Sequence, residues 1–414
     1  DAYIWLIGLV AAGVGLPFFA ISANAPLLQS WFARTGHPHA ADPYFLYAAS
    51  NAGSLIALLA YPVVLEPLLG LGAQAAAWTV AFYVLGLAIA GTGLLMVAAM
   101  RNLPAAAAER PVETSAAPVT WRQRAFWITL AAIPSGLLVA FTSFLTTDIA
   151  SAPFLWVLPL AAFLPTFIVV FRARPLVSHS LMQYAQPILV AGVLIGISTV
   201  GGSGWTTAAL AGTGAFLVTT LVCHRELYER RPASVHLTEF YLWMSFGGVV
   251  GGALAAIVAP HAFSTIWEFP LLLVAFALCR RHILRRLPAD QQRELLVIAI
   301  VGFAVLAGLQ MLARSGFAGS VGTLRMLLLV GCSGLSILSA AFPARQLALM
   351  VVAGLSIAVL PSAMNRGEAE RSFFGVHRVA MLDDDIRVLL HGTTIHGAER
   401  VRTNAQGDAR PVPM

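Results

Sequence analysis

Charged side chains are scarce in this chain. They make up 11% of its 414 residues, whereas a soluble domain carries about 25%. Hydrophobic residues account for 58%, and they are arranged in long continuous runs. A bilayer core is crossed by roughly 20 apolar residues in a helix. The composition therefore excludes an ordinary water-soluble domain and predicts an integral membrane protein with many helices.

Lysine is absent, so all 25 basic residues are arginine, and the formal net charge is +6. A nucleic-acid-binding protein needs a basic face on a soluble domain. No such face is found, because the arginines cluster at the ends of apolar runs. We therefore expect no nucleic-acid partner and interpret the arginines as determinants of membrane orientation.

Cysteine is also rare, and its three positions (Cys223, Cys279 and Cys332) lie in or beside apolar runs. This number and spacing exclude a disulfide framework and a zinc pattern. His391 and His396, with His377 nearby, lack a further close ligand. We therefore expect no metal site and no cofactor.

The apolar runs divide into about twelve segments of span length. These are Tyr3–Trp31, Tyr44–Leu65, Ala76–Met100, Phe126–Asp148, Phe154–Phe171, Met182–Val200, Thr206–Cys223, Phe240–Val258, Ile266–Ile283, Leu295–Leu312, Val321–Ala341 and Leu347–Ala363. Several contain proline, which membrane helices tolerate and which predicts kinks. The expected fold class is an all-α polytopic membrane protein.

Four regions follow from this pattern. Residues 1–101 hold about three spans, and residues 102–121 form a linker rich in Ala, Pro and Glu. Residues 122–364 hold about nine spans. Residues 365–414 alternate in polarity around a turn signal at Asp383–Asp385, which predicts the opening hairpin of a β-rich soluble domain.

Arginine is concentrated in alternate loops, for example at residues 280–286. The positive-inside rule places these loops in the cytoplasm and Asp1 outside. With twelve spans, the tail after Ala363 also lies outside. A synthase domain that uses a nucleoside-type cofactor is expected in the cytoplasm, so the side of the tail stays open.

The segment Cys223–Tyr241 concentrates ionisable groups in a chain that otherwise avoids them. His224, Glu226 and Glu239 are its candidate binding residues, with an anion site or a proton relay as the functional interpretation. The alternative is a cytoplasmic loop with interfacial arginines and a helical Glu226–Arg230 pair.

Two glycine stripes follow at helical spacing. Gly247 and Gly251 form one stripe, and Gly248 and Gly252 form the other. Stripes of small residues let membrane helices approach closely. They predict close static packing, with a moving helix or a dimer contact as the alternative.

Three further acidic residues lie near span ends: Glu66, Asp148 and Glu268. They are candidates for contact with a cationic substrate. As alternatives, Asp148 caps the start of a helix and the other two lie at the membrane interface.

Long motifs resemble the membrane portion of the fused major facilitator/spermidine synthase family of bacterial proteins. They are Ile21–His37, Asp42–Ser54, Leu145–Leu160, Cys223–Gly252, Ser372–Val376 and Leu390–Gly397. The resemblance covers nearly the whole chain. It implies that further helices precede Asp1 and that an aminopropyltransferase-type domain follows Met414, so this chain is expected to be a piece of a longer protein.

The resemblance implies a transporter-like bundle, in part like the major facilitator superfamily, in a bacterial inner membrane. It implies that the bundle handles a polyamine or another small amine. No aminopropyltransferase catalytic residue is expected within this chain. Two alternatives stay open: an accessory subunit that binds membrane lipids, other membrane subunits or a second copy, and a membrane anchor for an enzyme downstream.

Overall fold

The computed structural model describes most of the chain. The described residues are 2–35, 37–101, 118–149, 155–171, 178–198, 204–276, 287–315, 318–339, 341–359, 367–372, 375–383, 386–392, 394–403 and 409–412. The central part of the predicted linker and the arginine-rich segment 280–286 lie outside these ranges.

Helices dominate the described residues because a backbone in hydrocarbon has to satisfy its own hydrogen bonds. Within the described ranges, eight helices are long and apolar enough to cross a membrane. They are Ile4–Ala33, Phe45–Leu68, Leu71–Ala98, Trp121–Thr146, Thr206–Glu229, Ser234–Ala262, Ala289–Arg314 and Val321–Leu338. These helices support the prediction of a multi-pass membrane protein.

The other predicted spans are shorter as helices. They are α8 (Val157–Val170), α9 (His179–Ser198), α16 (Pro343–Val359) and α13 (Glu268–Ala275). The apolar runs that contain α8, α13 and α16 continue into residues outside the described ranges. The number of about twelve spans therefore stays a prediction.

Three wide helical turns lie next to proline. Such turns occupy Ala11–Gly15, just before Pro17, Tyr61–Leu65, which contains Pro62, and Leu254–Val258, just before Pro260. Proline removes a backbone N–H and its ring crowds the carbonyl four residues earlier. A locally widened turn relieves that crowding without ending the helix. The long helices Ala2–Ala33 (α1, η1 and α2) and Phe45–Leu68 (α3, η2 and α4) therefore continue through their prolines.

The chain forms two compact units. Unit 1 comprises Asp1–Ala125, Phe167–Pro175 and Tyr228–Trp243, and unit 2 comprises Phe126–Thr166, Leu176–Leu227 and Met244–Met414. Unit 1 thus holds α1–α5, where α5 is Leu71–Arg101, and the start of α11 (Leu237–Ala253). Unit 2 holds most of α7 (Trp121–Ser143) and α10 (Gly204–Glu229), and all of α14 (Ala289–Arg314), α15 (Ala318–Leu338) and α16.

The core of unit 1 is aromatic and hydrogen-bonded. The Tyr241 hydroxyl donates to Gln29 Oε1 at 2.7 Å, and the Tyr44 hydroxyl donates to the carbonyl of Pro232 at 2.9 Å. The ring of Tyr47 packs against that of Tyr241, with centroids 5.2 Å apart. Tyrosine suits this setting because its ring is apolar and its hydroxyl binds a polar partner.

In unit 2, one glycine stripe of α11 lies directly against α7. A Cβ built on Gly251 would collide with the carbonyl oxygen of Ala132, and one on Gly247 with that of Ile128. The second stripe has room, because a Cβ on Gly248 or Gly252 meets only the Ser135 hydroxyl oxygen at 3.9 Å. That hydroxyl donates to the carbonyl of Gly248 at 2.8 Å. Only the Gly247–Gly251 stripe is therefore required for the backbone approach.

The tail folds into a five-stranded antiparallel sheet in the order β1–β2–β3–β4–β5. The strands are Glu368–Ser372, Gly375–Asp383, Ile386–His391, Thr394–Thr403 and Ala409–Val412. The predicted hairpin corresponds to β2 and β3, where Val379 pairs with Leu389. The sheet extends beyond this prediction, because β4 continues the meander with Ala398 opposite Val388.

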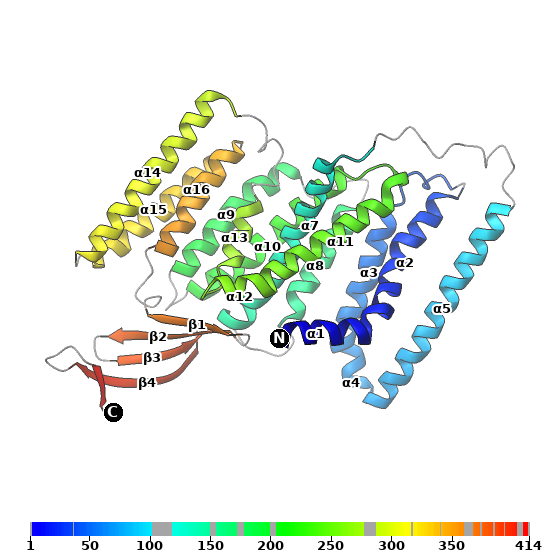
Figure 1. The fold of residues 1–414 in the computed structure, drawn as a ribbon, viewed down its shortest axis with the longest axis horizontal. Coiled ribbons are helices and arrows are strands. Elements are labelled where there is room, and N and C mark those ends of the chain that lie inside the picture. Colours follow the sequence, from blue (N-terminus) through cyan, green and yellow to red (C-terminus); the bar gives the residue numbers. More distant parts are fainter. Residues whose placement is uncertain are drawn as a thin grey trace. The chain divides into compact units, whose positions relative to one another are not determined.

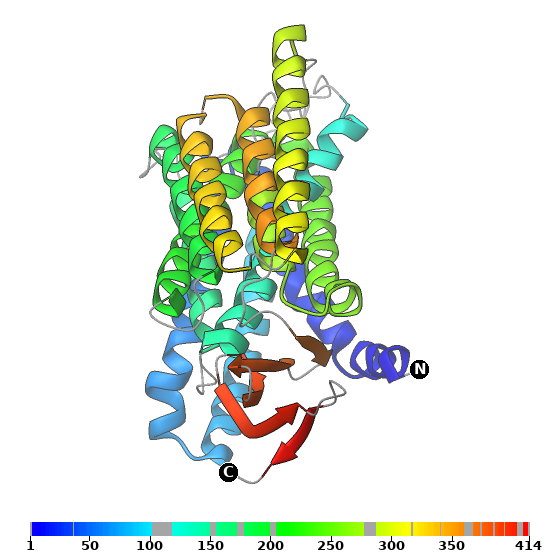
Figure 2. The same cartoon turned by 90° about the vertical axis from the view of Figure 1, so that its left-hand side faces the viewer.

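The sheet lies at one end of the helices of unit 2. In both views it is next to the finishing end of α16, and α14 begins at the opposite end (Figure 1 and Figure 2). Its small core consists of Ala380, Val388 and Leu390.

The two glycine stripes predict unequal tolerance to a methyl group. Gly251→Ala should lower the stability by about 1–3 kcal/mol, because the added carbon overpacks a fixed backbone contact. Gly252→Ala is the matched control, and its thermal unfolding in detergent should stay within about 0.5 kcal/mol of the parent. Equal melting temperatures for the two variants would contradict the assignment.

Candidate functional site

Helix α10 buries several polar residues inside a span. Thr219, Thr220 and Cys223 are fully enclosed, and His224 and Glu226 are each 1% exposed. At 3.6 residues per turn, Thr219, Cys223 and Glu226 lie along one side of the helix, and Thr220 and His224 lie along the adjacent side. Ionisable and polar groups are costly in a membrane interior, so such a cluster marks a functional-site candidate. We call these five residues the α10 polar face.

The hydrogen bonds around His224 indicate which of its ring nitrogens carries the proton. Its Nδ1 lies 2.8 Å from the hydroxyl oxygen of Thr166, a residue of α8. Thr166 donates its only hydroxyl proton to the carbonyl of Phe163. His224 Nδ1 is therefore the donor to Thr166, and in the neutral ring Nε2 is the basic nitrogen.

Two hydroxyls of the α10 polar face lack a partner within the described part of the chain. They belong to Thr219 and Thr220, and both oxygen atoms are buried. Thr220 lies one turn before His224, and Thr219 lies one turn before Cys223. An enclosed hydroxyl without a hydrogen bond is destabilising by about 1–3 kcal/mol. A polar group that hydrogen-bonds to either hydroxyl would remove this cost.

Two of the predicted binding residues, His224 and Glu226, are buried in α10, and because they are two positions apart on a helix they point in different directions. Glu239 lies in unit 1, where it accepts from Arg124 Nε at 2.6 Å, and His236 Nδ1 lies 3.8 Å from it. Glu66 is exposed in α4 (Glu66–Leu68). The backbone of Asp148 lies in the wide turn Phe144–Ile149, and its side chain is outside the described part.

Glu268, the remaining predicted residue, lies in a buried ion pair. Its two carboxylate oxygens accept from Arg371 at 2.6 and 3.0 Å. Arg371 also donates to the carbonyl of Thr265 at 3.0 Å. The side chains are 5% and 8% exposed, and they join the start of α13 to β1 within unit 2. Two parallel N–H···O bonds fix this geometry more firmly than a single contact would.

Sequence reasoning missed Thr166, Thr219, Thr220 and Arg371. The threonines are single hydroxyl residues within apolar runs, and such residues are common in membrane helices. Arg371 carries a clearer signal, because it is an arginine among the alternating residues of an expected strand. Its partner is 103 positions away, and no local pattern reports that distance.

Among the described residues, no group of three or more His, Cys, Asp and Glu side chains lies close enough to hold a metal ion. The rings of His377 and His391 stack at 4.6 Å in the sheet as a cross-strand pair.

The chain was compared with protein-family models, with curated proteins and with solved structures, and none of them matches.

The buried pair predicts an asymmetric response to substitution. Arg371→Ala should destabilise unit 2 by about 3–5 kcal/mol, because it leaves the Glu268 carboxylate buried without its partner. The combined Arg371→Met and Glu268→Leu variant should recover much of that loss. Unfolding of the detergent-solubilised protein measures both changes.

Arg387→Ala is the control for this comparison. Arg387 pairs with Glu399 at 3.1 Å, and both side chains are about two-fifths exposed, at 37% and 42%. An exposed pair of this kind contributes about 0–1 kcal/mol. A loss from Arg371→Ala no larger than that from Arg387→Ala would show that the buried pair does not hold the sheet to α13.

Proposed function

We propose that this chain is the transporter-like, multi-pass membrane domain of a spermidine-synthase-like fusion, and that it handles a polyamine or another small amine. The α10 polar face is the observation that carries the proposal. A carboxylate, an imidazole and two unpartnered hydroxyls are enclosed in one span. Buried ionisable groups in membrane helices characteristically mark substrate and proton pathways.

The chemistry of the α10 polar face favours an amine. An ammonium group only donates hydrogen bonds. Glu226 offers carboxylate acceptors, Thr219 and Thr220 offer hydroxyl oxygens, and His224 offers Nε2 when it is neutral. A buried carboxylate also balances the charge that a cationic substrate brings into the bundle. In this proposal Glu226 binds an ammonium group of the substrate, and His224 lies on the adjacent side of the helix.

The proposal gives smaller roles to the other predicted acidic residues, which are Asp148, Glu66, Glu268 and Glu239. The Glu268 and Glu239 carboxylates are paired with arginine, so a substrate would have to displace that partner. Asp148 and Glu66 stay proposed contacts near the span ends, and they rest on sequence position alone.

A second candidate is an accessory membrane subunit without transport activity. It is favoured by the first three spans, because 0%, 6% and 6% of their most apolar windows are buried within the chain. Such faces are covered by lipid, by other membrane subunits or by a second copy. A single monomeric band in mild detergent would count against this candidate.

We further propose that the sheet lies on the side opposite to the arginine-rich loop at residues 280–286, which is the extracytoplasmic side. Arg371 of β1 bonds the turn before α13, and α13 leads toward that loop. The sheet is bonded to the starting end of α13, the arginine-rich segment follows the other end of α13 in the sequence, and the positive-inside rule assigns that segment to the cytoplasm. In this arrangement, any synthase domain that continues from the sheet faces away from the cytoplasm.

The transport proposal predicts uptake that depends on Glu226. The full-length protein in proteoliposomes should take up labelled spermidine or putrescine, and Glu226→Gln should lower uptake at least about tenfold, because an amide cannot balance the buried ammonium charge. Glu399→Gln, an exposed sheet residue, should transport normally. Absence of uptake by the unmodified protein, with binding undetectable by calorimetry, would refute the proposal.

The placement of the sheet has its own test. A single cysteine at Ile395, which is exposed in β4, should react in intact cells with a maleimide that cannot cross membranes. A cysteine in the linker at Ala107 should react only after lysis. Both are made in a chain whose three native cysteines are replaced. Labelling only at Ala107 in intact cells would reverse the topology.

A further inference from the structure

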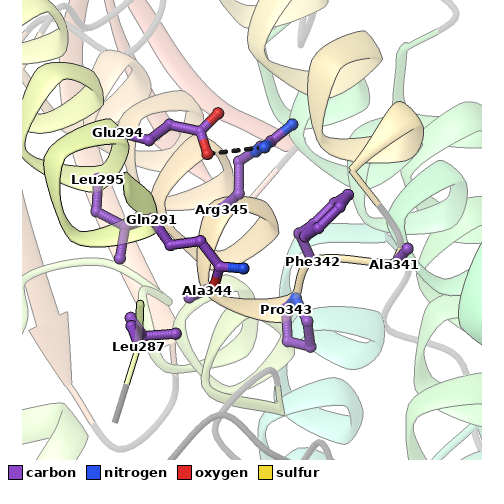
Figure 3. Close-up of a pocket in the computed structure, with 9 residues that line it drawn as sticks. All are labelled: Leu287, Gln291, Glu294, Leu295, Ala341, Phe342, Pro343, Ala344 and Arg345. Carbon is purple, nitrogen blue, oxygen red and sulfur yellow. Dashed lines mark hydrogen bonds and ion pairs between the residues drawn. The ribbon is translucent and has the colours of Figure 1, made fainter. Parts of the chain in front are cut away.

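A cavity of about 240 Å³ lies between the first turns of α14 and α16 in unit 2. Its wall combines apolar side chains of Leu287, Leu295 and Phe342 with the polar side chains of Gln291, Glu294 and Arg345 (Figure 3). The cavity does not include the α10 polar face, so its role is separate from the proposed transport site.

The polar part of this cavity carries both charges. Arg345 Nη2 donates to Glu294 Oε2 at 2.7 Å, and the guanidinium lies 4.6 Å from the centre of the Phe342 ring. The Nε atom of Arg345 is enclosed and has no hydrogen-bond partner within the described residues. Figure 3 shows the guanidinium between Glu294 and Phe342, with the second carboxylate oxygen of Glu294 outside the drawn ion pair. A cationic donor, Arg345, and an anionic acceptor, Glu294, therefore lie side by side, and each has polar atoms that the ion pair does not use.

The cavity lies at headgroup depth by its position in the chain. Leu287 follows Arg285 and Arg286 directly, and α14 then runs through 26 mostly apolar residues to Arg314. Arginines at the end of a span lie at the membrane–water interface. The cavity is therefore at the arginine-rich end of α14, and the sheet is at the other end of this unit (Figure 2).

We propose that this cavity binds the headgroup of a zwitterionic membrane phospholipid that carries a phosphate and a primary ammonium, as in the ethanolamine class. The phosphate is bound by the guanidinium of Arg345, and the ammonium by the Glu294 carboxylate. Gln291 supplies an amide hydrogen bond, and Leu287, Leu295 and Phe342 contact the glycerol end and the start of the acyl chains.

The charge pair selects among lipid headgroups. A purely anionic glycerol headgroup would meet the Glu294 carboxylate without a cation to balance it. A choline headgroup has a cation without N–H donors, so it cannot hydrogen-bond to that carboxylate. Charge-assisted hydrogen bonds of this type contribute about 1.5–3 kcal/mol, which corresponds to a preference of about tenfold or more.

Native mass spectrometry of the whole chain in detergent tests the proposal. The protein is titrated with ethanolamine, glycerol and choline phospholipids of matched acyl chains. The expected order has the ethanolamine lipid binding about tenfold tighter than the others. Glu294→Gln should reduce this difference to less than about threefold, and Arg345→Gln should weaken all three lipids. Arg314→Gln, at the far end of α14, is the control and should leave the order unchanged.

A cavity-filling variant keeps the test independent of the ion pair. Ala344→Phe occupies the cavity and leaves both charges in place, so it should lower binding of the ethanolamine lipid with an unchanged melting temperature. Equal binding of the three lipids by the unmodified protein would overturn the proposal, as would an unchanged preference in Glu294→Gln. If free phosphoethanolamine displaced the lipid at equal concentration, the proposal of a lipid would be overturned, and the cavity would instead be assigned to a soluble ligand of the same chemistry.

Discussion

A hydrocarbon environment offers no hydrogen-bond partner, and this constraint acts at every level of the structure. It requires the backbone to form helices, because only a helix satisfies its own N–H and C=O groups within one segment. It makes close backbone contact an effective way to hold helices together, as at Gly251 against Ala132. It also raises the free energy of any polar side chain without a partner. The pairs, stripes and clusters of this chain follow from these consequences.

A charged side chain is the most costly polar group to bury, and Glu268 and Arg371 are buried as an ion pair. The sheet has a core of only a few small apolar residues, and so small a core contributes little stability on its own. Arg371 connects the first strand to the start of α13 by bonds to a carboxylate and a backbone carbonyl. A buried pair is weak evidence of net stability, since desolvation offsets most of the attraction. Its contribution is geometric: it determines where the sheet lies against the helices.

Sequence reasoning reached the elements that depend on local pattern. Long apolar runs identified the eight span-length helices of the described residues, and the alternation after residue 365 identified β2 and β3. The two glycine stripes were equivalent in sequence, because adjacent residues on a helix present neighbouring faces. Only the position of α7 distinguishes Gly251 from Gly252. The partner of Glu268 was likewise out of reach, since the pair joins residues that are distant in the chain. Thr219 and Thr220 acquire meaning only through their burial.

The α10 polar face and the α14–α16 cavity solve opposite problems of recognition. The polar face is enclosed and presents mostly acceptors, with its one carboxylate at Glu226, so it is complementary to a group that donates hydrogen bonds and carries positive charge. The cavity pairs Arg345 with Glu294 at the interface, so it is complementary to a group with both charges. A net charge is tolerated in the interior only together with its counter-charge. A carboxylate that is balanced by an arriving substrate, and not by a permanent arginine, is the arrangement that lets charge enter the bundle and leave it again. Glu268 does not fit that arrangement, because its counter-charge, Arg371, is built into the fold.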